Sequence, residues 1–244
     1  MLLFRFLLAT VLMLAACTAG QDPIAKLPPK ERAKALAEME VLRKTGAVQR
    51  FDMVVRRMLP VIERECRARG GLKCRFAIVV DTNPKLPPNA FMSLDRADRP
   101  VIVFTGSLLK DTRNEDELAL VLGHEVAHHL LGHVPVTRES VWEGALLGGI
   151  EAATRGGGEK EIHAAEQRGA LKAVLGFSKK FEIEADRLGA ILALKAGFDP
   201  VRGAEYFVRM KNPRNRFLST HPPNSARRAA VRRVVARYRK AAGG

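Results

Sequence analysis

Residues 124–128 read His-Glu-Val-Ala-His, and this HExxH pattern constrains the fold and the chemistry more than any other segment of the chain. On an α-helix, residues four apart lie one turn apart on the same face, so both imidazoles can bind one metal ion. Glu125 lies roughly a quarter turn away, beside the metal, where its carboxylate can accept a proton from a water. The pattern therefore predicts a helix that presents two metal ligands and a general base.

The flanking sequence favours a helix around this motif. Asn114 can cap the N-terminus of the helix, and Glu117 follows three residues later, which is capping-box spacing. The stretch LALVLGHEVAHHLLG then follows without a proline. We therefore expect a capped, amphipathic helix through residues 114–132.

A second helical segment, FEIEADRLGAILALKAG at residues 181–197, offers the third ligand that a catalytic zinc ion needs. Glu182 and Asp186 are four residues apart and share a helix face, whereas Glu184 points to roughly the opposite side. We assign Glu182 as the third ligand and Asp186 as the acceptor for the ring N–H of a ligand histidine. Glu184 is interpreted as a solvated or salt-bridged residue.

Three further histidines are expected to lie outside the site. His129 is rotated off the metal face of the helix, and His133 would lie on roughly the opposite side from His124. His163 sits in a polar stretch. We interpret these three as structural or surface residues.

The first 16 residues read as a targeting segment. One Arg precedes an apolar run that is short for a spanning helix, and small residues follow the run. Residues 14–17, Leu-Ala-Ala-Cys, resemble the lipobox of bacterial lipoproteins. The resemblance implies that residues 1–16 are a lipoprotein signal peptide and that Cys17 is lipidated. An ordinary cleaved signal with a chance cysteine is the alternative.

Several expectations about location follow from this interpretation. Residues 17–28 would be a lipidated tether, and residues 29–244 would be the folded domain. Thr18 after the cysteine, instead of Asp, favours the outer membrane. No later apolar run reaches spanning length. We therefore expect a protein that is anchored to the cell envelope, facing the periplasm, rather than embedded in a membrane.

Cys66 and Cys74 remain once Cys17 is assigned to the anchor. An exported protein meets an oxidising compartment, which favours a disulfide between them. Two unpaired thiols are the alternative, because the sequence does not give the distance between the two side chains.

The rest of the chain predicts helices, then a small sheet, then helices, which is an α+β domain. Helical patterns cover residues 30–44, 50–69 and the tail from Asn224, and short strand patterns cover residues 76–80, 90–94 and 101–105. Residues 134–165 look irregular, with glycine-rich patches at 144–149 and 156–158. Because glycine holds a single conformation poorly, we expect a mobile lid over the site between Gly144 and Gly158.

HExxH followed by E-x-E-A-D resembles the HtpX and CAAX-prenyl-protease type of zinc metallopeptidases, an Oma-like family of the gluzincin class. The resemblance covers roughly residues 89 to 228. Its other motifs are Asn89-Ala90-Phe91, VFTGSL at residues 103–108, Glu117-Leu118-Ala119, and Thr220-His221-Pro222 with Arg227. It implies a gluzincin-type fold, mostly helical with a small β-sheet, and one zinc ion per chain. With the lipobox, the chain looks like the periplasmic lipoprotein branch.

The resemblance also implies that His221 and Arg227 sit at the active site. Arg227 has independent support, because in a tail helix it shares a face with the apolar Val231 and Val234. An inward arginine is costly unless it is paired, so we expect it to meet a carboxylate or the substrate backbone.

These observations predict a zinc endopeptidase that acts on polypeptides. Glu125 would take a proton from a water and return it to the leaving amine, and His221 would stabilise the oxyanion, with Arg227 as a second candidate. The strand at residues 101–105 would pair with an extended substrate. By family analogy the substrates would be misfolded or misassembled envelope proteins.

Two rival functions come from other classes. A chaperone or assembly factor for outer-membrane proteins would bind such chains without cutting them. A cationic envelope-binding protein would explain the formal net charge of +15. Nucleic acid is not an expected partner, because no binding motif is present and two Tyr and one Trp offer little for base stacking.

Overall fold

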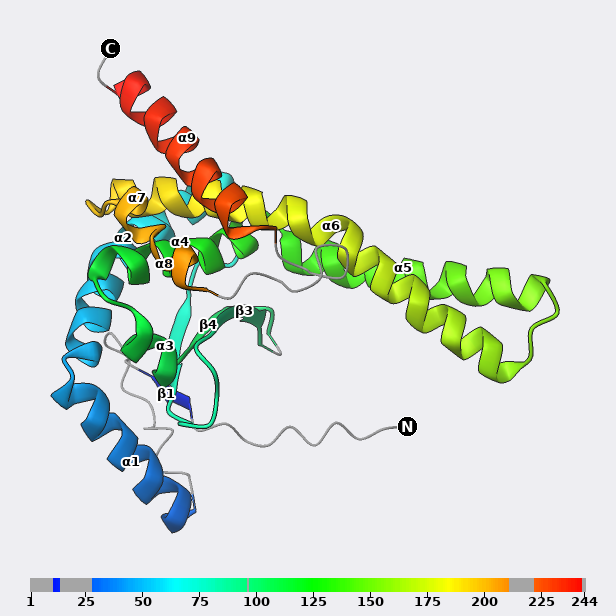
Figure 1. Ribbon diagram of the computed structural model, residues 1–244, viewed down its shortest axis with the longest axis horizontal. Coiled ribbons are helices and arrows are strands. Elements are labelled where there is room, and N and C mark those ends of the chain that lie inside the picture. The colour runs from blue at the N-terminus through cyan, green and yellow to red at the C-terminus, as the bar shows by residue number, and fades with distance from the viewer. Residues whose placement is uncertain (1–10, 14–27, 96, 211–221, 243–244) are drawn as a thin grey trace.

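The structure is a computed structural model that describes residues 11–13, 28–95, 97–210 and 222–242 (Figure 1). Helices dominate it, and a small sheet lies on one side of them. The described elements are β1 (Val11–Met13), α1 (Pro29–Lys44), α2 (Ala47–Arg69), β2 (Ala77–Asp81), β3 (Ala90–Leu94), β4 (Pro100–Thr105), α3 (Gly106–Asp111), α4 (Glu115–Leu130), α5 (His133–Thr154), α6 (Glu159–Lys195), α7 (Pro200–Gly203), α8 (Tyr206–Arg209) and α9 (Asn224–Ala242). The expected α+β class and gluzincin-type, mostly helical fold are confirmed.

The sheet has the strand order β1-β2-β4-β3. β2 runs parallel to β4, β3 runs antiparallel to β4, and β1 pairs antiparallel with β2. β1 lies within the predicted signal peptide, whose removal would leave the order β2-β4-β3. The prediction that residues 101–105 pair with a substrate is wrong, because β2 and β3 already occupy both edges of β4.

Helix α4 is the central element, and it contacts α2, α6, α7, β3 and β4. Its predicted cap is present: the Asn114 side chain accepts a hydrogen bond from the Glu117 amide at 3.1 Å. Glu117 is buried and receives both Nη atoms of Arg209, at 2.8 and 2.6 Å. The buried Asp116 pairs with Arg202. These ion pairs attach the start of α4 to the segment that carries α7 and α8.

Two glycines let α4 and α6 approach each other closely. A Cβ atom on Gly123 would lie 2.5 Å from the carbonyl oxygen of Gly189, and one on Gly189 would lie 2.6 Å from the His124 amide nitrogen. Any larger residue at either position would push the two backbones apart. The glycine pair therefore brings the backbone of α6 against the residue that opens the HExxH motif.

Helices α5 and α6 form a long hairpin that projects from the rest of the molecule (Figure 1). The expectation that residues 134–165 are irregular is wrong, because all of this segment except residues 155–158 is helical. A mobile lid between Gly144 and Gly158 stays a prediction. The glycines have a packing role instead: a Cβ on Gly144 or Gly148 would collide with the backbone of Gly169 or Ala165. Their missing side chains allow the two helices to touch.

Several large apolar side chains of α5 are exposed. Trp142 is 74% exposed, and four more large apolar side chains of α5 are exposed beside it, namely Val136, Leu146, Leu147 and Ile150. A concentration of exposed apolar side chains on one helix is typical of an interaction site. Among the described helices, none has the length and apolar run needed to span a bilayer.

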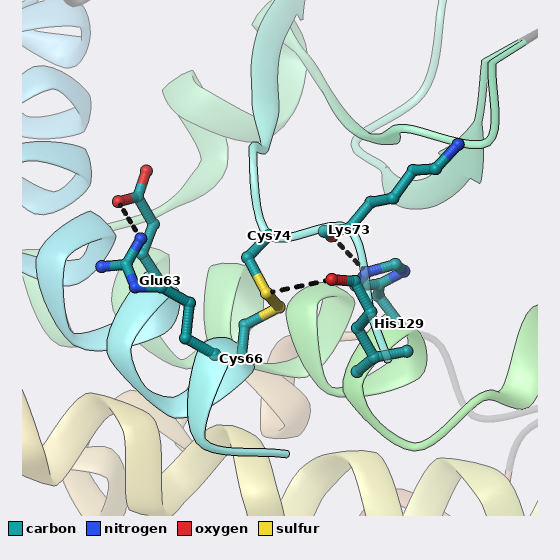
Figure 2. The surroundings of a disulfide bond; sticks show 7 residues. Glu63, Cys66, Lys73, Cys74 and His129 are labelled. Atoms are coloured by element: carbon teal, nitrogen blue, oxygen red, sulfur yellow. Dashed lines mark hydrogen bonds and ion pairs between the residues drawn. A yellow bond between two sulfur atoms is a disulfide. The ribbon is translucent and has the colours of Figure 1, made fainter. Parts of the chain in front are cut away.

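A disulfide between Cys66 and Cys74 joins the last turn of α2 to the segment before β2 (Figure 2). It resolves the alternative that the sequence left open. Next to it, the Lys73 carbonyl oxygen lies 2.8 Å from Nε2 of His129 on α4. Figure 2 shows the disulfide and this hydrogen bond side by side, so the short loop fastens α2 and α4 together.

Replacing both cysteines by alanine should lower the free energy of unfolding by about 2 to 3 kcal/mol. The bridge closes a loop between residues eight apart in sequence, and its loss frees that loop in the unfolded chain. Urea denaturation of the variant and of the reduced wild-type protein measures the loss. Equal stability of oxidised and reduced wild-type protein would contradict this role.

Candidate metal centre

Helices α4 and α6 bring His124, His128 and Glu182 together, with one ligand atom of each within 4.8 Å of the others. The Nε2 atoms of the two histidines are 3.2 Å apart. Nε2 of His124 lies 3.5 Å from Oε2 of Glu182, and Nε2 of His128 lies 3.5 Å from Oε1 of the same carboxylate. The three side chains thus face one common point.

These spacings fit zinc. Two donors bound to one tetrahedral zinc at about 2.0 to 2.1 Å lie about 3.3 Å from each other. The observed separations of 3.2 and 3.5 Å bracket that value. Two imidazoles and one carboxylate are also a ligand set of catalytic zinc sites, which keep a fourth position open.

Asp186 and Arg227 hold the far side of the His124 ring. Nδ1 of His124 lies 2.9 Å from Oδ1 of Asp186. Arg227 donates to both oxygens of Asp186, through Nε at 2.8 Å and Nη2 at 2.7 Å. Its guanidinium also stacks over the ring of Phe207, 4.1 Å from the centroid. The prediction that Arg227 points inward and meets a carboxylate is confirmed. Its Nη2 atom also lies 3.2 Å from Nδ1 of His124 and 3.8 Å from Oε2 of Glu182.

The electrostatics of this cluster favour a cation. Burial alone would lower the pKa of His124, but its contacts with Asp186 and Glu182 outweigh burial and raise the pKa to about 10. Burial would raise the pKa of Asp186, but Arg227 outweighs burial and holds it below its usual value. Asp186 is therefore an anion, and positive charge is stabilised where the two Nε2 atoms converge.

Glu125 lies next to this point and outside the group of ligands. Its side chain is partly buried. Burial raises the pKa of Glu125, although the neighbouring His124 and His128 act in the opposite direction. A raised pKa suits a carboxylate that must accept a proton and give it back near neutral pH.

The other histidines show where sequence reasoning succeeded and where it failed. His129 points away from the ligands to the Lys73 carbonyl, and His163 lies at the surface beside Glu166, as expected. His133 does not lie away from the site, because its Nδ1 is 3.0 Å from Nδ1 of His128. Its Nε2 is 3.3 Å from Oε2 of Glu184.

The sequence feature that could have placed His133 correctly was Gly132, which immediately precedes it. A continuous helix would have turned His133 away from His124, but Gly132 has a φ of 70° and ends the helix. Burial, with His128 nearby, lowers the pKa of His133 to about 4. Two other predicted positions, Cys17 and His221, lie outside the described residues.

A buried HExxH helix whose metal face is completed by a carboxylate from a second helix is the arrangement of a metallopeptidase. Comparison with known proteins gives the same class. The sequence profile of peptidase family M48 matches residues 50–235, and the chain belongs to that family.

Individual relatives are similar over part of their length. Mitochondrial metalloendopeptidase OMA1 of Saccharomyces cerevisiae is 31% identical over 167 residues, which are 64% of this chain and 46% of that protein. The protein of the same name from Schizosaccharomyces pombe is 32% identical over 173 residues, 68% of this chain and 49% of that protein. A beta-barrel assembly-enhancing protease of Yersinia pestis is 30% identical over 130 residues, 50% of this chain and 26% of that protein. The matched regions cover less than half of each relative.

Proposed function

We propose that this metallopeptidase is a zinc-dependent endopeptidase of the bacterial cell envelope. The observation that supports the zinc assignment is the donor set of His124, His128 and Glu182, with separations of 3.2 to 3.5 Å. Bound there, zinc supplies Lewis-acid polarisation of the scissile carbonyl and a lower pKa for an attacking water.

The residues of the chain perform the proton transfers. Glu125 accepts a proton from the water as its oxygen bonds to the carbonyl carbon, and then passes that proton to the leaving amine as the C–N bond breaks. His221 is proposed as a hydrogen-bond donor to the oxyanion. Arg227, predicted to be catalytic, is proposed to act through the ligands and Asp186, because it donates two hydrogen bonds to Asp186 and lies beside His124 and Glu182.

The substrate strand is proposed to pair with β3 instead of β4. β3 is at the end of the strand order, and its other edge has no partner among the described residues. It also contacts α4, the helix that carries Glu125. An extended polypeptide added there would be held by main-chain hydrogen bonds, which tolerate many sequences.

The location is proposed from the N-terminal sequence and the relatives. Residues 1–16 would be a signal peptide, Cys17 the lipidated residue, residues 17–28 a tether and residues 29–244 the peptidase domain. Some bacterial relatives are named beta-barrel assembly-enhancing proteases. We therefore place the enzyme at the outer membrane, with misfolded or misassembled envelope proteins as its substrates.

Cells that contain only a Glu125→Gln protein should accumulate full-length envelope proteins that wild-type cells degrade. The change removes the proton acceptor and leaves the proposed ligands in place. Quantitative proteomics of the envelope fraction measures this, and the same fraction shows by mass spectrometry whether Cys17 is lipidated. Identical envelope proteomes would contradict the substrate class, and an unmodified Cys17 in the mature protein would contradict the anchor.

A second candidate function is binding of unfolded envelope chains without cleavage, as a chaperone or assembly factor. The exposed apolar side chains of α5, with Trp142 the most exposed of them, favour it. The cells that contain only the Glu125→Gln protein also distinguish these two functions. A chaperone would work equally well with Glu125→Gln, whereas a peptidase would not.

A further inference from the structure

We infer that His133, supported by Glu184, is a positioning residue that holds His128 in its metal-binding orientation. The inference rests on the proposed zinc site and adds two residues to it.

The chain places His133 beside His128 by a break between two successive helices. Helix α4 ends at Leu130, and Gly132 in the left-handed region caps the next helix, which starts at His133. The two helices follow one another along α6, since Gly123 of α4 faces Gly189 and Gly144 of α5 faces Gly169. The break between them interrupts the helical repeat, and the ring centroids of His128 and His133 lie 5.0 Å apart. His133 is also buried, at 3% exposure.

The protons can be placed from the geometry alone. A histidine that binds a metal through Nε2 keeps its proton on Nδ1. Nδ1 of His128 therefore donates to Nδ1 of His133, 3.0 Å away, and the proton of His133 must be on Nε2. That N–H points to Oε2 of Glu184 at 3.3 Å. One consistent set of tautomers therefore links Nε2 of His128 on the metal side, through His133, to the carboxylate of Glu184.

Packing fixes the plane of the His133 ring, which lies between His128 and Glu184. Phe181 stacks on His133 with a centroid distance of 4.1 Å and an interplanar angle of 9°. Residues 181–184 of α6 thereby supply the stacking ring, the ligand Glu182 and the acceptor Glu184 within one turn. The segment that completes the metal site also holds the residue that orients His128.

The two ligand histidines are held by separate groups. The ring of His124 is held by Asp186 and Arg227, through α6 and α9. The ring of His128 is held by His133 and Glu184, through α5 and α6. The two groups can be altered independently, because no described hydrogen bond joins them except through the ligands.

The test measures zinc affinity by competition with a chromogenic chelator, together with the visible spectrum of the cobalt-substituted protein. His133→Phe keeps an aromatic ring on Phe181 but removes the acceptor, and it should weaken zinc binding about 10- to 100-fold. His133→Asn places a carbonyl oxygen near the former Nδ1 and should recover most of the loss. The matched control is His129→Phe, which changes a buried histidine of α4 that faces the Lys73 carbonyl, and it should leave zinc affinity and the cobalt spectrum unchanged.

The outcomes separate this inference from the proposed function. Wild-type zinc affinity and an unchanged cobalt spectrum in His133→Phe would overturn it, as would equal losses in the Phe and Asn variants, since packing alone would then be responsible. A wild-type protein that binds no zinc would instead refute the proposed metal site. Circular dichroism and thermal melting of each metal-free variant show whether a loss of affinity is a loss of fold.

Discussion

Glu125→Gln should reduce turnover of an unfolded polypeptide by about a thousandfold or more while leaving fold and zinc content intact. The glutamine has the same shape but cannot accept the proton of the attacking water, and general-base catalysis contributes about 10² to 10⁴ in rate. Zinc should remain, because Glu125 is outside the group formed by His124, His128 and Glu182. Stability should also hold, because the carboxylate is partly buried with a raised pKa and a neutral side chain costs little there.

A fluorescent unfolded polypeptide reports turnover, and mass spectrometry of metals reports zinc. The matched control is Glu143→Gln on α5, which removes an exposed carboxylate and should have no effect on either quantity. Turnover near that of the wild type in Glu125→Gln would eliminate Glu125 as the base. Loss of zinc in this variant would instead mean that Glu125 supports the metal.

The elements that the sequence predicted well are those with local signals. The three strands at residues 76–80, 90–94 and 101–105 lie within one residue of β2, β3 and β4. The Asn114 cap, the start of α9 at Asn224 and the convergence of His124, His128 and Glu182 were also predicted correctly. In each case, turn residues, capping spacing or the four-residue helical repeat act over a short range.

The hairpin of α5 and α6 could not be predicted in this way. Gly144 and Gly148 weaken a helix by their intrinsic propensity, so the segment looked irregular. Their effect in the folded protein is tertiary, because a Cβ at either position would collide with the backbone of α6. The gain from close helix packing is visible only when the second helix is known.

The site likewise contains residues that local patterns predicted and residues that they did not. Asp186 was found because it shares a helix face with Glu182, and the inward position of Arg227 followed from its apolar neighbours in α9. His133 was missed because its place depends on one backbone angle at Gly132. Glu184 is partly exposed and lies within ion-pair distance of Lys180, as expected of a salt-bridged residue, but its contact with His133 could not be foreseen once His133 was misplaced. The prediction that residues 101–105 pair with a substrate was wrong because the order of strands in a sheet depends on pairing between segments far apart in the sequence.

Glu182→Ala should lose zinc binding by more than about 100-fold, and activity should fall with it. Loss of a neighbour that only orients a ligand costs about 10- to 100-fold in affinity, and loss of a direct ligand should exceed that range. Glu182 is also the one negatively charged member of the donor set, so its loss leaves two neutral imidazoles to hold a dication.

The fold should survive this change. Arg227 keeps its two hydrogen bonds to Asp186, so no buried charge is left without its main partner. Glu161→Ala, an exposed glutamate on the same helix, is the matched control and should bind zinc like the wild type. Glu184→Ala should fall between the two, because it removes the acceptor behind His133 but no ligand. One zinc per chain in Glu182→Ala, at an affinity equal to that of Glu161→Ala, would show that the third ligand lies elsewhere.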